Sequence, residues 1–247
     1  MRNITSLDNQ EIKNIAALKD AKERYAQEKF VAEGVRTIST ILKGNIKLSA
    51  LYVIEKLFTQ ALEIAAADKI IIISERVMDK ISQTTSPSGI LAVFEMPKNP
   101  SPELLTPGLV LANISDPGNM GTLMRTAAAL DIKSVVVVDG TDPFGPKVVQ
   151  ASAGTIAQLN VFTWQWHELI HNKGTLTLHA LVVSNGKKPE TVDKKSALLV
   201  IGNEAHGIDK NWIADCTDQV TIPMPGNTES LNAAIAGSIT AYEVFGK

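Results

Sequence analysis

The sequence is poor in cysteine, in aromatic residues and in long apolar runs. Its 247 residues include a single cysteine, Cys216, so the chain forms neither an internal disulfide nor a thiolate cluster for zinc. Charge, glycine or proline interrupts every apolar stretch within about ten residues, too short for a membrane span. The first residues, MRNITSLDNQ, lack a signal-peptide core. We therefore expect a cytoplasmic protein without a membrane segment, in which Cys216 has no chemical role.

The usual nucleotide-binding patterns are missing as well. Neither G-x-G-x-x-G nor the P-loop pattern occurs, which argues against ordinary dinucleotide and nucleotide folds. The formal net charge of −2 argues mildly against nucleic-acid binding. The charge is uneven, however: residues 1–98 carry 14 Lys and Arg against 12 Asp and Glu, and residues 99–247 carry 10 against 14. An RNA partner is therefore expected to bind the N-terminal segment.

A proline-rich stretch divides the chain. Residues 96–102 read MPKNPSP, and prolines so closely spaced disfavour both helix and strand pairing. We expect a small α/β domain over residues 1–96, a linker over 97–104 and a larger domain over 105–247. The elements expected before the linker are helices at 8–29 and 34–42 and strands at 51–54, 69–73 and 90–94.

Beyond the linker, short segments rich in β-branched residues alternate with helical segments. This alternation is typical of a mainly parallel sheet with helices on both faces, so the expected fold class is α/β. Ligands in such folds bind beyond the carboxyl ends of the strands, which makes the following loops the candidate sites. The strands expected here are 109–111, 134–138, 178–183, 198–201 and 220–222.

The first of these loops reads NISDPGNMGTLMR and ends at Arg125. Pro117 and the two glycines that follow, Gly118 and Gly121, predict a tight turn. Asn119 is suited to cap the helix that begins there. Arg125 is either a surface residue lying over apolar neighbours or a cation placed for an anion.

The second loop reads IGNEAHGI and directly follows an expected strand. Its glycines, Gly202 and Gly207, either supply unusual backbone angles for a turn or allow the backbone to approach a ligand. In the second case Glu204 would orient a partner cation. His206 is expected to be solvated rather than catalytic, and no second histidine or cysteine lies at metal-ligand spacing, so no metal site is expected.

The third loop reads IPMPGNTESLN and opens the last helix. Thr228, Ser230 and Asn232 crowd the start of that helix. Capping explains one of them, and a surplus of polar groups at a helix start suits a ligand site. The apolar stripe expected along this helix consists of Leu231, Ile235, Ile239 and Tyr242.

The three loops, in this order and spacing, resemble the three motifs of the SpoU family of RNA 2′-O-ribose methyltransferases, also called TrmH. The matching stretches are NISDPGNMGTLMRTAAAL, LLVIGNEAHGI and IPMPGNTESLNAAIAGSITAYE. QASAG, at residues 150–154, is similar to the family's short Ser-Ala-Gly segment. FVAEGV and SPSGILAVF are similar to parts of its N-terminal RNA-binding domain. The resemblance therefore covers nearly the whole chain.

The resemblance implies S-adenosyl-L-methionine as cofactor, RNA as partner and a ribose 2′-hydroxyl as methyl acceptor. It implies a C-terminal α/β domain with a parallel sheet and a trefoil knot (the SPOUT fold), a small N-terminal α/β RNA-binding domain, and a homodimer. The N-terminal part is similar to that of the rRNA-directed branch, so 23S rRNA is the expected substrate. Gln150 departs from relatives that often carry arginine there, at an RNA-phosphate contact.

The resemblance also assigns roles to individual residues. We expect Arg125 to bind the phosphate beside the ribose and to stabilise oxyanion charge, because a guanidinium is too weak an acid to serve as a simple base. Glu204 would position Arg125 or brace the dimer. The residues expected at the cofactor are Gly202, Ile222 and Leu231, and those expected in the polar active-site set are Asn119, Arg125, Glu204, Ser230 and Asn232.

Three alternatives stay open at this point. The substrate could be transfer RNA rather than ribosomal RNA. The chain could be a non-catalytic RNA-binding or ribosome-assembly factor on the same fold. It could also be a knotted methyltransferase that modifies a base rather than a ribose.

Overall fold

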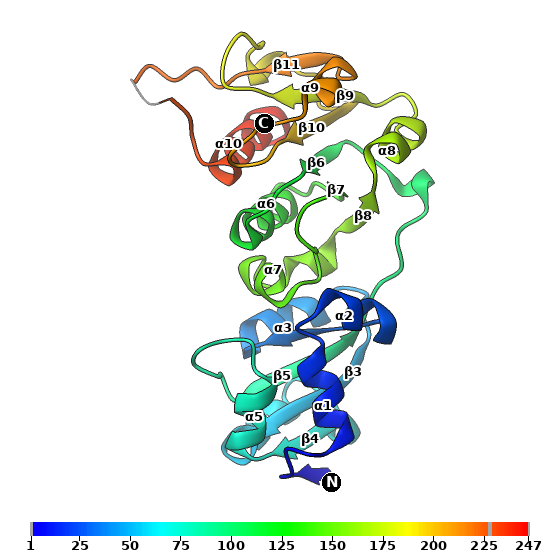
Figure 1. Ribbon diagram of the computed structural model, residues 1–247, viewed down its shortest axis with the longest axis vertical. Coiled ribbons are helices and arrows are strands. Elements are labelled where there is room, and N and C mark those ends of the chain that lie inside the picture. Colours follow the sequence, from blue (N-terminus) through cyan, green and yellow to red (C-terminus); the bar gives the residue numbers. More distant parts are fainter. Residues whose placement is uncertain (1, 227–228, 247) are drawn as a thin grey trace. The chain divides into compact units, whose positions relative to one another are not determined.

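The computed structural model describes residues 2–226 and 229–246 (Figure 1). Contacts divide this part of the chain into two compact units. The first unit is formed by the described residues of Met1–Lys98 together with Phe144–Gln158, and the second by those of Asn99–Pro143 and Leu159–Lys247. The expected domain limits at residues 96 and 105 stay a prediction.

The first unit is built on a five-stranded mixed sheet in the order β1-β4-β3-β5-β2. β1, β4 and β3 pair in parallel, whereas β5 runs antiparallel to both β3 and β2. An apolar core packs between one face of this sheet and the helices α1 and α5. The strands are β1 (Arg2–Ile4), β2 (Lys29–Glu33), β3 (Leu48–Ile54), β4 (Ile70–Ile73) and β5 (Ile90–Glu95), and the helices are α1 (Gln10–Ala17), α2 (Ala21–Gln27), α3 (Val35–Leu42), α4 (Phe58–Leu62), α5 (Glu75–Ile81) and α7 (Pro146–Ala151).

The single helix expected over residues 8–29 is in fact two, which corrects that prediction. α1 ends at Ala17, and Asp20 starts α2 by accepting a hydrogen bond from the Lys22 amide. The buried Arg24 side chain donates to the carbonyl oxygens of Leu18 and Lys19 between the helices, at 2.8 Å each. These contacts satisfy backbone groups that a continuous helix would have paired internally, so the break is stable.

The second unit has a six-stranded sheet in the order β11-β9-β10-β6-β7-β8, and every neighbouring pair is parallel. β6, β7 and β10 are buried along their whole length, as strands covered on both faces must be. The expected α/β class with a parallel sheet is therefore confirmed. The strands are β6 (Gly108–Ala112), β7 (Ser134–Val138), β8 (Asn160–Trp164), β9 (Thr177–Leu181), β10 (Ala197–Ile201) and β11 (Asp218–Val220), and the helices are α6 (Pro117–Ala129), α8 (Trp166–Asn172), α9 (Lys210–Ala214) and α10 (Ala233–Phe245).

Strand order changes direction at β6, because β7 follows on one side of it and β10 lies on the other. Such a switch point is where α/β sheets leave room for ligands. β9 and β11 end at Leu181 and Val220, two residues before their expected ends, so the residues that follow are free to line a site. The trefoil knot stays a prediction.

Two local expectations at the start of α6 need correction. Asp116 rather than Asn119 caps α6, and the Pro117 and glycine segment forms the first turns of that helix instead of a separate turn. Among the polar residues expected at the start of the last helix, Asn232 is the one that caps α10. Within the expected linker, the Asn99 side chain pairs with the backbone of Thr163 on β8, donating at 3.2 Å and accepting at 2.9 Å.

Candidate active site

A cavity of about 350 Å³ opens at the carboxyl ends of β9, β10 and β11. Five of the eight residues expected at the site line it, which brings the second and third loops together. Its walls are the ends of the strands, the loop after β10, the segment after β11 and the start of α10. The five expected residues on its lining are Gly202, Glu204, Ile222, Ser230 and Leu231. Thr228, named with the third loop, lies outside the described residues.

The loop after β10 is a closed turn held by Asn203. Asn203 and Gly207 exchange two backbone hydrogen bonds, at 2.9 and 3.0 Å. Inside the turn, the Asn203 side-chain oxygen accepts from the amides of Ala205 and His206. Its side-chain nitrogen donates to the Asn113 carbonyl at 2.9 Å. Asn203 therefore shapes one wall of the cavity and fastens it to the loop after β6.

Gly202 is required by the tightness of this turn. A β-carbon at residue 202 would lie 2.5 Å from the carbonyl carbon of Gly207 and from the amide nitrogen of Ile208. Backbone atoms cannot yield as a flexible side chain can, so any larger residue would open the turn. This tight turn forms part of the cavity lining, which includes each of residues 202–207.

Glu204 joins the second loop to the first through four hydrogen bonds. Its carboxylate accepts from the Ser115 amide at 3.2 Å, the Ser115 hydroxyl at 2.8 Å and the Asp116 amide at 3.1 Å. The fourth donor is the side-chain amide of Asn119, at 2.9 Å. All four donors come from the segment between β6 and the first turn of α6, so one carboxylate organises that entire segment.

The pKa of the Glu204 carboxyl is lowered to about 2. Burial raises it, but hydrogen bonds from Asn119, from its own main-chain amide and from the Ser115–Asp116 segment outweigh burial. The carboxylate is therefore ionised at neutral pH. A group in this state orients hydrogen-bond donors and does not exchange a proton during a reaction near pH 7.

Asn119 also joins the third loop. Its side-chain oxygen accepts from the Asn232 side-chain amide at 3.0 Å. The Asn232 oxygen caps α10 by accepting from the amides of Ala234 and Ile235, at 2.9 and 3.2 Å. Glu204, Asn119 and Asn232 thus form a continuous hydrogen-bonded chain that links all three loops of the sequence motifs.

Arg125 is the one expected residue outside both the cavity lining and this chain. It lies on α6 with its side chain exposed, and within the described residues it has no hydrogen-bond or ion-pair partner. Its neighbour Thr126 bonds to Ser238 at 2.8 Å, where α6 packs against α10. Within the described residues the Glu204 carboxylate bonds to the loop after β6, and its expected role of positioning Arg125 or bracing the dimer stays a prediction.

Ser115 and Asn203 are site residues that the sequence reasoning did not select. Both lie within the motif loops, and the Asn203 amide also contacts the Ser115 hydroxyl at 3.4 Å. An asparagine or serine in a glycine-rich loop is a common turn former. Their role at the site is distinguished from ordinary turn formation only by the hydrogen bonds that pair two loops distant in sequence.

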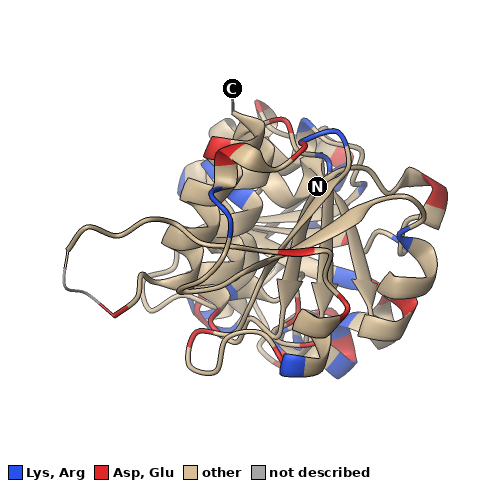
Figure 2. Ribbon diagram, turned by 90° about the horizontal axis from the view of Figure 1, so that it is seen from above, with Lys and Arg blue, Asp and Glu red and all other residues tan. Residues whose placement is uncertain are grey.

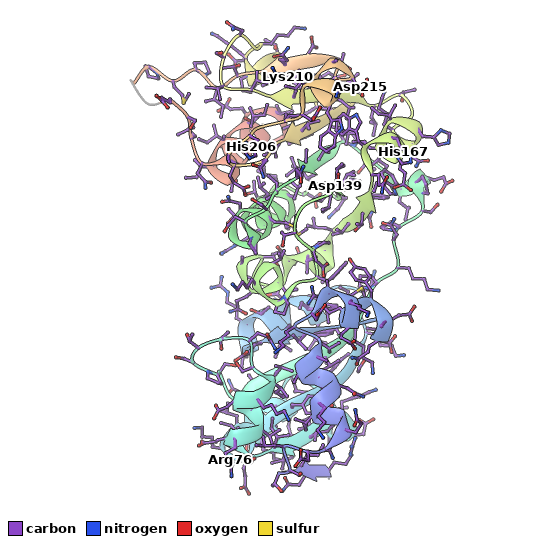
Figure 3. All side chains as sticks on the ribbon, in the orientation of Figure 1. Arg76, Asp139, His167, His206, Lys210 and Asp215 are labelled. Carbon is purple, nitrogen blue, oxygen red and sulfur yellow. The ribbon has the colours of Figure 1, made fainter. Side chains whose placement is uncertain are left out.

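Two further expectations concern histidine and cysteine. His206 is exposed in the loop between β10 and α9, where it is labelled in Figure 3. Burial, aided by Asp215, raises the pKa of the Cys216 thiol to about 12, so it is not a reactive thiolate. Among the described residues no group of three His, Cys, Asp or Glu side chains could hold a metal ion, and none of the helices is long and apolar enough to cross a membrane.

Two family models match the chain. Residues 107–242 match the SpoU rRNA Methylase family, and residues 9–92 match the MRM3-like substrate binding domain. The first match spans more than half of the chain and contains all three motif loops.

Individual relatives agree with these models over nearly full length. The chain is 27% identical to the 23S rRNA (guanosine(2553)-2′-O)-methyltransferase RlmP of Bacillus subtilis over 100% of both chains. It is 26% identical to the 23S rRNA (uridine(2479)-2′-O)-methyltransferase of Streptomyces viridochromogenes, over 92% of this chain and 86% of the relative. The crystal structure of an AdoMet-bound rRNA methyltransferase from Sinorhizobium meliloti superimposes with a TM-score of 0.87 at 26% identity, covering 98% of this chain and 97% of that chain.

Proposed function

The chain belongs to the SpoU rRNA methylase family, and from that premise we propose that it methylates a ribose 2′-hydroxyl of 23S rRNA with S-adenosyl-L-methionine. The observation that carries the proposal is the hydrogen-bonded chain Glu204–Asn119–Asn232 beside a cavity at the carboxyl ends of β9, β10 and β11. A protein that only bound RNA would have no need to fix three separate loops around a cavity of ligand size.

The cavity suits S-adenosyl-L-methionine. Its volume of about 350 Å³ lies within the range of small-molecule sites. The turn formed by residues 202–207 lines one side, and the Ile222 and Leu231 side chains offer apolar surface. Leu231 remains 37% exposed, which leaves this apolar surface available to a ligand. Gly202, Ile222 and Leu231 are thus the residues that would hold the cofactor.

When bound, the cofactor supplies a methyl group already activated on a sulfonium, so the protein's contribution is alignment and charge stabilisation. Glu204, which stays ionised, holds the Asn119 amide, and Asn119 in turn holds Asn232. Ser230 lies on the cavity wall at the same end of α10 and would orient the ribose. Arg125, exposed and unpaired among the described residues, would bind the adjacent phosphate and stabilise the developing oxyanion.

The N-terminal part of the chain supports an RNA substrate. Residues 9–92 match a substrate-binding domain, and the named relatives act on 23S rRNA. One of those relatives modifies a guanosine and the other a uridine, so the family match does not fix the base of the target nucleotide. We place the activity in the cytoplasm, with the ribosomal RNA.

A homodimer is part of the proposal. Ile235, Ile239 and Tyr242 of α10 are 53%, 39% and 54% exposed, and Leu231 continues the same stripe. This is the apolar stripe expected from the sequence, and in a single chain it is exposed to solvent. Apolar side chains gathered on one helix face are typical of an interface, and a second copy of this chain would cover them.

One experiment separates this function from its alternatives. Purified protein is incubated with methyl-labelled S-adenosyl-L-methionine and with 23S rRNA or transfer RNA from a strain that lacks the gene. We expect label in 23S rRNA as a 2′-O-methylnucleoside after complete digestion. Label in transfer RNA, or on a base, would replace the proposed substrate or reaction, and absence of cofactor binding by calorimetry would favour the non-catalytic alternative.

A further inference from the structure

A second cavity, of about 280 Å³, lies in the first unit, apart from the cofactor pocket. It opens at the free edge of the five-stranded sheet, where β2 is the outermost strand. Val31 and Leu91 are buried and form an apolar floor. One wall is formed by the segment after α5 in the sequence, and the other wall is formed by α7. The residues on these walls are Gln83 and Thr84 on one side and Pro146, Lys147, Gln150 and Ala151 on the other.

Glu33 fixes the first wall. Glu33 is only 7% exposed, and its carboxylate accepts hydrogen bonds from the segment that follows α5. It accepts from the hydroxyls of Ser82 and Thr84, at 2.8 and 3.1 Å, and from the amide of Ser88 at 2.9 Å. A buried carboxylate with this many donors stabilises one loop conformation. Gln83 and Thr84 are therefore presented to the cavity by a built structure.

α7 supplies the second wall, although it lies between β7 and β8 in sequence. It packs against β2, and the ring of Phe144 just before it lies tilted against that of Phe30 with ring centroids 5.4 Å apart. After it, a β-carbon at Gly154 would lie 2.4 Å from the Thr37 carbonyl oxygen, and φ there is +81°, so only glycine suits this close approach to α3. The segment is thus fitted closely to the first unit.

Lys147 and Gln150 bring unused polar groups to this wall. Both are exposed, and within the described residues neither side chain has a hydrogen-bond or ion-pair partner. Elsewhere basic and acidic residues are interspersed along the ribbon, as Figure 2 shows. With a formal net charge of −2, the chain has no overall positive charge to attract RNA, so individual contacts such as these would contribute to binding.

We propose that this cavity receives one unpaired nucleotide of the substrate RNA, with its base on the Val31–Leu91 floor and its phosphate at Lys147. An apolar floor with amide groups at the rim suits a base that has left its stack, which is how RNA sequence is usually recognised. The Gln150 amide can both donate to and accept from the edge of that base. This proposal rests on RNA being the substrate, and it adds α7 to the matched substrate-binding region.

The test compares Lys147→Ala with Lys22→Ala, an exposed lysine on α2 in the same unit. Binding of 23S rRNA from a strain lacking the gene is measured over a series of salt concentrations. Lys147→Ala is expected to weaken binding about tenfold and to reduce the slope of log K against log salt by about 0.7, the loss of one single-strand phosphate contact. Lys22→Ala should leave both unchanged, and both variants should bind the cofactor as the wild type does.

A second arm tests the base separately from the phosphate. Ala151→Leu, which fills the cavity, should weaken RNA binding while leaving the salt slope unchanged, and a melting curve checks that the variant is folded. A photo-crosslinking residue placed at Thr84 should attach to RNA. The proposal is overturned if Lys147→Ala behaves like Lys22→Ala, or if the crosslink goes to protein. If the wild type itself does not methylate ribose in RNA, the proposed function fails instead, so the two failures are distinct.

Discussion

The Asn232 side-chain amide lies 3.0 Å from the side-chain oxygen of Asn119 and donates to it across 113 positions of sequence. The Asn119 side-chain amide in turn donates a hydrogen bond to the Glu204 carboxylate. The geometry of each loop therefore depends on the other two.

Asn232→Asp separates capping from site geometry. Aspartate keeps the oxygen that caps α10 but replaces the donor to Asn119 with a second acceptor. We expect methyl transfer to fall at least tenfold with an unchanged melting temperature. Asn232→Ala, measured alongside, should also lose about 1 kcal/mol of unfolding free energy, because the cap is lost. Full activity in the aspartate variant would show that the Asn119–Asn232 hydrogen bond is not needed for methyl transfer.

Glu204→Gln should show a stability difference that depends on pH. The folded-state pKa of about 2 lies below the ordinary value of 4.5, so the charge stabilises the fold fully above about pH 4.5. That stabilisation is lost as the pH falls through 2. Urea unfolding from pH 3 to pH 8 should therefore give a constant difference from the wild type above pH 5 and a shrinking one below. Glu63→Gln, an exposed glutamate without a hydrogen-bond partner among the described residues, serves as control and should change little at any pH.

Gly202→Ala should damage the cofactor pocket directly. The added carbon would meet backbone atoms 2.5 Å away, and such overpacking costs about 1–3 kcal/mol. We expect S-adenosyl-L-methionine affinity, measured by calorimetry, to fall at least tenfold. Gly226→Ala is the matched control, because a β-carbon there has no neighbour within 4 Å among the described residues. Equal affinities in the two variants would contradict the assignment of the 202–207 turn to the cofactor pocket.

Arg125→Ala should lower the rate of methyl transfer about 100-fold or more, while leaving cofactor affinity within about twofold of the wild type. The residue lies outside the cofactor cavity, so only the RNA step should suffer. Arg125→Lys should recover part of the rate, since it keeps the charge and loses the forked donors. Single-turnover rates and calorimetry on the same preparations check this, and turnover at the wild-type rate in Arg125→Ala would exclude the assigned role.

Ile235→Glu should convert the dimer to a monomer. It places a charge in the middle of the exposed α10 stripe, where a second copy would have to bury it. Leu62→Glu makes the same change at a residue that is 46% exposed on α4, away from the stripe, and should remain dimeric. Analytical ultracentrifugation distinguishes the two masses. If wild type, variant and control all sediment as one species of monomer mass, the dimer proposal is wrong.

Much of the second unit could be predicted from the sequence, because buried parallel strands are continuous apolar runs and the loops after them carry the polar residues. Capping was the weak point. Asn119 and Asp116 are both good caps by type, and only the contact with Glu204, 85 positions away, decides which of them is used. The split between α1 and α2 was missed for a similar reason, since it depends on the buried Arg24 side chain. Local pattern identifies suitable residues, and tertiary contact selects among them.

The most direct test of the proposed function is a map of 2′-O-methylated positions in 23S rRNA. RNA is taken from the parent strain, from a strain lacking the gene, and from that strain carrying either the wild-type gene or Arg125→Ala. We predict that one ribose methylation is lost on deletion, restored by the wild-type gene and not restored by the variant. Identical maps in the parent and the deletion strain would contradict the proposal that this chain methylates ribosomal RNA.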